Sequence, residues 1–101
     1  MADAADPRRR SERVVAQVPI RVAAGGVEAL GETAVVNSHG ALILCGASAA
    51  DGDEIRITNT VSGESVVCRV VWAGGEDETG LKKYGIELLE ERPLFWGFEI
   101  E

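Results

Sequence analysis

The chain has 101 residues and a formal net charge of -7 at pH 7, with 46% hydrophobic and 27% charged residues. This length gives one domain with a modest core, and the composition is that of a globular chain and not of a disordered one. The acidic balance argues against binding to DNA or RNA, which depends on many phosphate contacts from lysine and arginine.

Positive charge is concentrated near the N-terminus. Residues 1–22 hold five arginines and three acidic residues, whereas the rest of the chain holds five basic and fourteen acidic residues. The run Arg8-Arg9-Arg10-Ser11-Glu12-Arg13 therefore predicts a local site for an anion. Arginine suits phosphate because its planar guanidinium can donate two parallel hydrogen bonds. We expect residues 1–13 to form a flexible arm and residues 14–101 to form a single domain.

Apolar and polar residues alternate in several short segments that are separated by turn signals, a pattern typical of β-strands. The predicted strands cover residues 18–22, 27–36, 41–45, 54–58, 65–73 and 84–89. Six such strands without a helical segment predict a small antiparallel β-barrel, because closure removes exposed strand edges in a domain too small to cover them.

Several local signals refine this prediction. Pro19 cannot donate to a strand ladder, so the first strand is expected to lie at an edge or to begin irregularly. Gly31 suggests a bulge in the second strand. The clearest turn is Asn37-Ser38-His39-Gly40, since Asn and Gly tolerate turn conformations best. In the longest strand, one face is predicted to carry Val66, Cys68, Val70 and Trp72.

The two cysteines, Cys45 and Cys68, lie in apolar, strand-like surroundings. A reduced, buried thiol is the usual state there, and a disulfide is the alternative. The sequence shows neither the apolar core of a signal peptide nor a stretch long enough to span a membrane. These features predict a cytoplasmic protein that does not insert into a membrane.

A short aromatic tail follows the last predicted strand. Pro93-Leu94-Phe95-Trp96-Gly97-Phe98 contains most of the aromatic residues of the chain. The sequence leaves open whether this tail packs on its own barrel or on a second copy, which would make a homodimer. Core packing is the more common use of such residues.

Two separated motifs and the strand pattern together resemble one family. Arg9 and Arg13 have the spacing of an RxxxR motif, with Arg8 just ahead, and Pro19-Ile20-Arg21-Val22 resembles a first strand. Val70-Val71-Trp72 and Tyr84-Gly85-Ile86-Glu87-Leu88 resemble a closing strand pair. In this order they resemble the PilZ domain, a bacterial module that binds the second messenger cyclic di-GMP. The resemblance covers nearly the whole chain and implies a six-stranded antiparallel barrel.

The second PilZ motif, D/NxSxxG, is only partly present. Alignment on Gly40 puts Val35 in the place of the acid or amide and Asn37 in the place of the serine. The other register, beginning at Asn37, puts His39 and Leu42 in the serine and glycine places and fits less well. In the family, the acid and the serine help to read the guanine edge, and the arginines hold phosphate and guanine.

The resemblance implies a cyclic di-GMP site formed by Arg8, Arg9, Arg13, Asn37 and Gly40. Because valine accepts no hydrogen bond, one guanine donor would lose its partner, at a cost of about 1–3 kcal/mol. The leading hypothesis is a cyclic di-GMP sensor that acts through an unidentified protein partner.

Two other functions compete with this hypothesis. A degenerate PilZ-like adaptor would have lost the nucleotide and would bind a protein, with the aromatic tail as the apolar contact surface. An oligonucleotide-binding barrel would show a steep salt dependence, and the net charge of -7 counts against it. The sequence shows no nucleophile–base pair, and no metal-ligand spacing around His39, its only histidine. We therefore expect no enzymatic activity, no metal and no cofactor.

Overall fold

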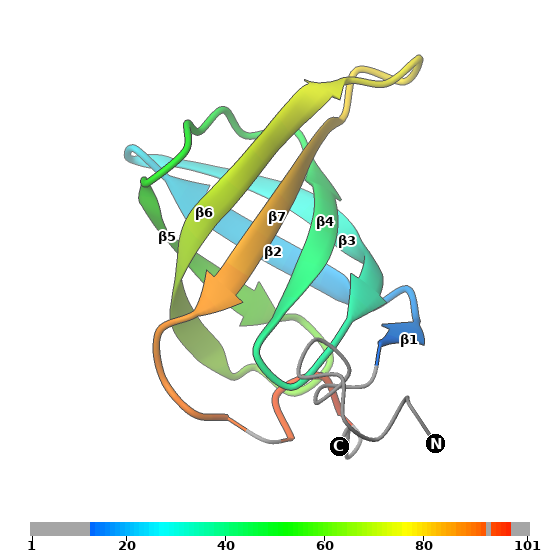
Figure 1. The fold of residues 1–101 in the computed structure, drawn as a ribbon, viewed down its shortest axis with the longest axis vertical. Coiled ribbons are helices and arrows are strands. Elements are labelled where there is room, and N and C mark those ends of the chain that lie inside the picture. Colours follow the sequence, from blue (N-terminus) through cyan, green and yellow to red (C-terminus); the bar gives the residue numbers. More distant parts are fainter. Residues whose placement is uncertain (1–12, 93, 98–101) are drawn as a thin grey trace, which may run out of the picture.

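The computed structural model describes residues 13–92 and 94–97. Within these ranges the chain forms seven β-strands and no helix (Figure 1). The strands are β1 (Val14–Val15), β2 (Pro19–Ala24), β3 (Val27–Val36), β4 (Gly40–Cys45), β5 (Glu54–Asn59), β6 (Ser65–Glu76) and β7 (Lys82–Leu88).

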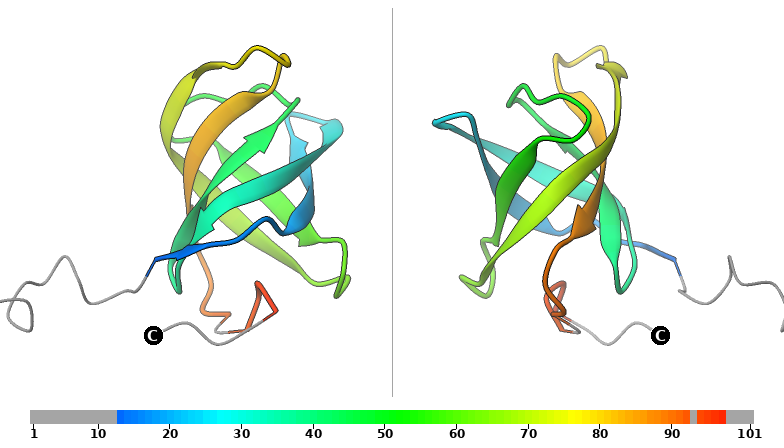
Figure 2. Two further views of the ribbon diagram at one scale, coloured as in Figure 1. Left: turned by 90° about the vertical axis from the view of Figure 1, so that its right-hand side faces the viewer. Right: turned by 60° about the vertical axis from the view of Figure 1, so that its left-hand side comes forward.

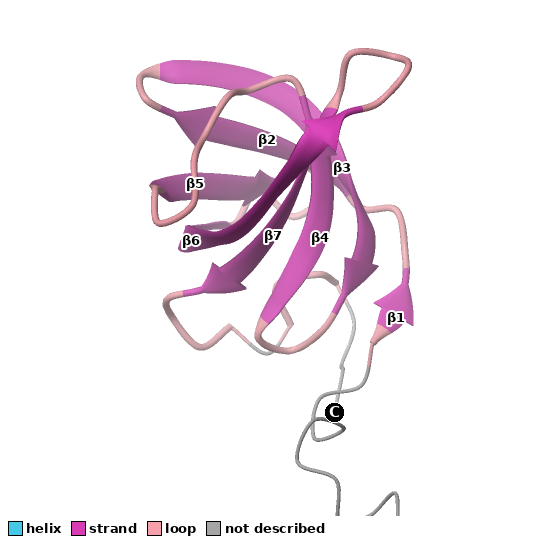
Figure 3. Ribbon diagram, turned by 45° about the horizontal axis from the view of Figure 1, so that its top comes forward, coloured by secondary structure: helices cyan, strands magenta, loops and turns pink. Residues whose placement is uncertain are grey.

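Six of these strands close into an antiparallel barrel. The hydrogen-bonded order is β3-β2-β5-β6-β7-β4, and β4 pairs again with β3. Figure 2 shows the barrel from two sides, and Figure 3 shows it tilted so that its top comes forward. β1 is a short additional strand that pairs with the end of β3. The predicted six-stranded barrel is therefore confirmed, with one strand more than the sequence indicated.

The core lies inside this barrel. Alternate residues along each strand are buried, as in Ile20 and Val22 of β2 and in Val66, Cys68 and Val70 of β6. Cys45 and Cys68 are free thiols in this core, as the sequence predicted. The turn signals were also informative, because Gly25 and Gly26 connect β2 to β3 with positive φ angles of 58° and 83°, which glycine adopts at little cost.

Three local predictions were wrong or incomplete. Trp72 leaves the buried face of β6, because a register shift between Val70 and Trp72 turns it outward, and its exposed fraction is 49%. The bulge of β3 lies between Thr33 and Val35 and not at Gly31. At Gly31 a Cβ would overlap the carbonyl oxygen of Leu44, so glycine allows β3 and β4 to approach closely there. β2 has neighbours on both sides, so it is not an edge strand; of the two alternatives for Pro19, the structure has the irregular start, because β2 begins at Pro19 after the break that follows β1.

Strand pairing with β3 is interrupted at residues 16–18, between β1 and β2, and the side chain of Thr33 bridges this interruption. The Thr33 hydroxyl accepts a hydrogen bond from the backbone N–H of Val18 at 2.8 Å and donates one to the carbonyl of Ala16. Thr33 is fully buried. These two bonds satisfy backbone groups that the interruption would leave unpaired. Thr33 therefore holds β1 against β3 and fixes the point from which residue 13 leaves the barrel.

The aromatic tail closes one end of the barrel. Phe95 and Trp96 are buried, with exposed fractions of 1% and 3%, and their rings meet edge to face at 4.9 Å between centroids. Asn59 Nδ2 donates to the Phe95 carbonyl at 2.8 Å, and Trp96 Nε1 donates to the Asn37 carbonyl at 3.1 Å. The turn of residues 94–97 lies below the barrel in Figure 1. This part of the tail packs on its own barrel; Pro93 and Phe98 lie outside the described residues.

Both cysteines are expected to be unreactive in the folded protein. Burial raises the pKa of the Cys68 thiol to about 12 and also raises the pKa of Cys45. The thiolate is the nucleophile, so iodoacetamide at pH 8 should modify neither residue in buffer and both in concentrated urea. Mass spectrometry counts the added groups. Rapid modification of the native protein would contradict the burial of these thiols.

Replacement of Thr33 by valine should destabilise the barrel. Thr33→Val keeps the shape but removes both hydrogen bonds, so we expect the free energy of unfolding in urea to fall by about 1–3 kcal/mol. Thr33→Ser is the control, because it keeps the hydroxyl and loses one methyl group, worth roughly 0.8 kcal/mol. Equal stability of Thr33→Val and the parent chain would show that the hydroxyl does not hold the interruption.

Candidate functional site

The candidate site is a hollow of about 420 Å³ where β3 turns into β4 beside β7. It is lined by Arg13, Val35, Val36, Asn37, His39, Gly40, Ala41, Leu42, Val71, Gly85, Ile86 and Glu87. The volume falls in the range of small-ligand sites. Three of the five predicted site residues, Arg13, Asn37 and Gly40, line this single hollow. The other two, Arg8 and Arg9, lie outside the described residues.

Strand register explains why the hollow forms on the outer surface of the barrel. Val35 pairs with Leu42, Leu42 with Gly85, and Gly85 with Trp72, so these residues form one row across β3, β4, β7 and β6. Paired residues share a face of a sheet, and Trp72 is half exposed, so this row faces outward. Gly85 lies between Leu42 and Trp72 in this row and carries no side chain, so the surface of the barrel is recessed there.

A second row lies beside the first and contains the other glycine of the hollow. Gly40 pairs with Glu87, and Glu87 pairs with Arg69. At Gly40 a Cβ would overlap the backbone carbonyl oxygen of Ile86. Any other residue would therefore push β4 away from β7. The close approach of β4 and β7 is by itself sufficient to require glycine at position 40, whether or not Gly40 contacts a ligand.

The turn at the end of the hollow is held by Asn37. Its side-chain Oδ1 accepts hydrogen bonds from the backbone N–H groups of His39 and Gly40, both at 2.8 Å. Its backbone carbonyl accepts the indole N–H of Trp96. Among the described residues, its Nδ2 has no acceptor. Asn37 therefore faces a ligand mainly as a donor, since its acceptor is already used by the turn.

Arg13 is brought to this turn by the pairing of β1. Val14 pairs with Val36, so the preceding residue, Arg13, stands opposite Asn37, which follows Val36. The second arginine of the RxxxR motif thus lies beside the second motif, although Arg13 and Asn37 are 24 positions apart in the sequence. A guanidinium at this position is suited to a phosphate oxygen or to the flat face of a base.

Val35 gives the hollow an apolar side where the family motif has an acid or an amide. Its backbone is fixed by pairing with Val15 on one side and Leu42 on the other. With Leu42 and Val71 it forms an apolar wall. The wall can pack against the face of a base but cannot accept a hydrogen bond from the base edge.

Glu87 is a residue of the hollow that sequence reasoning did not single out. Its Oε2 accepts a hydrogen bond from Arg69 Nη1 at 3.1 Å, in an ion pair whose side chains are 45% and 46% exposed. It is the only carboxylate among the described residues that line the hollow. The signal that could have identified it is its position two residues after Gly85, on the same face of the strand.

Other kinds of site find less support in the described part of the chain. Residues 13–92 and 94–97 contain no group of three or more His, Cys, Asp or Glu side chains placed to hold a metal ion. His39 is exposed on the turn, as the sequence suggested, and also lines the hollow. A search of the described residues for a helix long and apolar enough to cross a membrane found none.

Comparison with known proteins agrees with this geometry. The family model for the PilZ domain matches residues 7–93, which includes the RxxxR motif, all seven strands and the turn at Asn37. A search of curated proteins found no match. Because the family model spans most of the 101 residues, and because the barrel has the strand arrangement of that fold, the chain belongs to the PilZ domain family.

Proposed function

We propose that the chain is a cyclic di-GMP sensor that binds its ligand in the hollow between β3, β4 and β7. Arg9 and Arg13 hold the phosphates, with Arg8 beside them, while Asn37 and Gly40 form the opposite side. The observation that supports the proposal is the position of Arg13, which follows from the pairing of β1 with β3, so that one arginine of the RxxxR motif lines the same hollow as Asn37 and Gly40.

Charge supports a small anionic ligand over a nucleic acid. The net charge is -7, so most of the surface repels a polyanion. Arg13 gives the hollow a local positive group, and Arg8 and Arg9 precede it in the chain. A ligand with two phosphates and two guanines offers several acceptors to several guanidiniums, so binding would tie residues 8–13 to the turn at Asn37.

A protein-binding adaptor is the second candidate function. Val35 and the occupied acceptor of Asn37 both reduce what the hollow offers to a guanine edge. The aromatic tail is not available to a partner at Phe95 and Trp96, because both are buried. The exposed apolar residues of β6, Val71 and Trp72, are a better candidate contact surface.

Calorimetric titration with cyclic di-GMP tests the proposed function, with cyclic di-AMP and GTP as controls. Selective binding in the micromolar range, roughly -8 kcal/mol, is the expected result. Arg9→Ala and Arg13→Ala should each weaken binding by about tenfold to a hundredfold, since a hydrogen bond to a charged group contributes roughly 1.5–3 kcal/mol.

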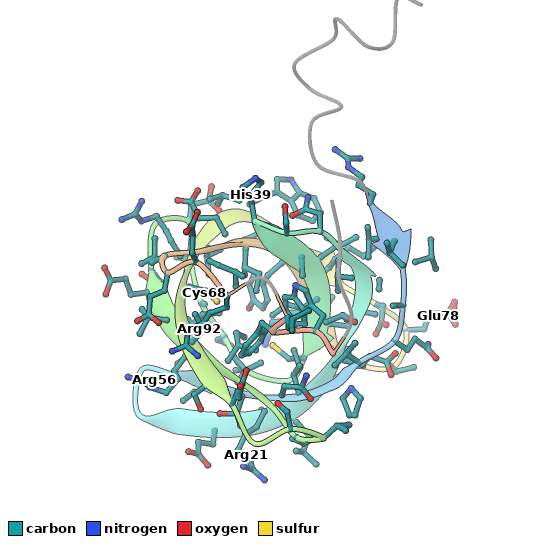
Figure 4. All side chains as sticks on the ribbon, turned by 90° about the horizontal axis from the view of Figure 1, so that it is seen from below. Arg21, His39, Arg56, Cys68, Glu78 and Arg92 are labelled. Carbon is teal, nitrogen blue, oxygen red and sulfur yellow. The ribbon has the colours of Figure 1, made fainter. Side chains whose placement is uncertain are left out.

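Arg21→Ala and Arg56→Ala are the matched controls. Both remove an exposed arginine from the barrel. Figure 4 shows Arg21 on the side of the barrel opposite His39 and Arg56 at the left of the view, away from His39. Each should leave the affinity within about twofold, because neither lines the hollow. Absence of heat and of any change in melting temperature for the parent chain at high ligand concentration would favour the adaptor.

A further inference from the structure

We infer that Glu87 reads the guanine edge in this chain and takes over the role of the acid that is missing at Val35. This inference rests on the proposed function, because it concerns how the same hollow distinguishes guanine from other bases. It assigns a specificity-determining role to a residue outside both PilZ motifs.

The chemistry of guanine requires an acceptor in the hollow. The Watson–Crick edge of guanine presents two adjacent donors, the ring N1–H and the exocyclic amino group, and a carboxylate can accept from both at once. Val35 accepts nothing, and Asn37 Oδ1 is already engaged with two backbone N–H groups. Among the described residues lining the hollow, only Glu87 carries a carboxylate.

The position of Glu87 suits this role. It stands directly across from Gly40 and two residues from Gly85, and its side chain lines the hollow with them. Gly40 is buried under the Ile86 carbonyl, and the Val71 and Trp72 side chains approach Gly85. A base that reaches Glu87 would therefore lie beside these groups, where Glu87 is half exposed. Val35 and Glu87 lie on either side of β4, two strand spacings apart and two residues apart along the strands, which is roughly 12 Å. The acceptor has thus moved from the β3 side of the hollow to the β7 side.

The ion pair with Arg69 leaves Glu87 available. Arg69 contacts only Oε2, and Oε1 has no hydrogen bond to the described residues. Both side chains are nearly half exposed, and ion pairs of this kind contribute little to stability. Arg69 therefore orients the Glu87 carboxylate through Oε2, while Oε1 can still accept a hydrogen bond from a ligand.

The effect of Glu87→Gln on cyclic di-GMP affinity has opposite signs under the two possible roles of this residue. If Glu87 is only a surface charge, removal of a negative group beside an anionic ligand should leave the affinity unchanged or increase it. If Glu87 reads guanine, the same change should weaken binding roughly tenfold to a hundredfold, because the amide turns its NH2 group toward the guanine amino group.

A ligand analogue separates edge recognition from general affinity. Cyclic di-IMP lacks the exocyclic amino group of guanine but keeps both phosphates. The parent chain should bind cyclic di-GMP about tenfold more tightly than cyclic di-IMP, and Glu87→Gln should lose this preference. Glu54→Gln is the charge control, since it removes the same charge from an exposed residue that pairs with Arg69 but does not line the hollow. It should keep both the affinity and the preference.

A double variant completes the test by returning the acid to the family position. Val35→Asp combined with Glu87→Gln should recover the preference for cyclic di-GMP over cyclic di-IMP. If the parent chain binds neither nucleotide, the proposed function fails, and the role of Glu87 fails with it. If the parent chain binds cyclic di-GMP and Glu87→Gln retains the full affinity and preference, the role of Glu87 is overturned while the proposed function stands.

Discussion

β3 pairs with three other strands, and both the barrel and the candidate site depend on this. Its first half pairs with β2, its last residues pair with β1, and its other edge pairs with β4 to close the ring. The change from β2 to β1 takes place at Thr33, whose buried hydroxyl bonds to Val18 and Ala16. Because β3 pairs with β1, β2 and β4, its position determines where the barrel closes, where the turn at Asn37 lies and where Arg13 lies.

The hollow combines groups that suit different parts of a nucleotide. Arg13 and the Nδ2 of Asn37 are donors for phosphate or for base acceptors, the Val35 wall is apolar, and Glu87 is an acceptor. Gly40 and Gly85 also line the hollow and contribute no side chains to it. The chain as a whole is acidic, so under the proposed function the preference for a small anion would depend on the position of a few arginines and not on the overall charge.

Much of the fold could be predicted from the sequence because period-two alternation and turn residues are local signals. The bounds of β3 and the turn at Asn37 were predicted well for this reason. Trp72 was predicted on the wrong face, because the register shift in β6 is not a local signal. Glu87 was not predicted at all, because its position in the hollow depends on pairing across β4, β7 and β6. A single residue inserted in a strand reverses which face its neighbours occupy, and nothing in the sequence of β6 marks that insertion. The division of the chain at residue 13 stays a prediction.

The hydrogen bond from Trp96 to the carbonyl of Asn37 links the site to the order in which the chain is made. Asn37 is synthesised before four of the seven strands, whereas Trp96 follows all of them. Chains emerge from the ribosome N-terminus first, so the turn that borders the hollow gains this partner only after every strand of the barrel has been synthesised. A nascent chain that ends before residue 96 carries both motifs but lacks the hydrogen bond from Trp96 to the turn at Asn37. The turn that borders the hollow would therefore be completed late in synthesis, when the end of the barrel closes.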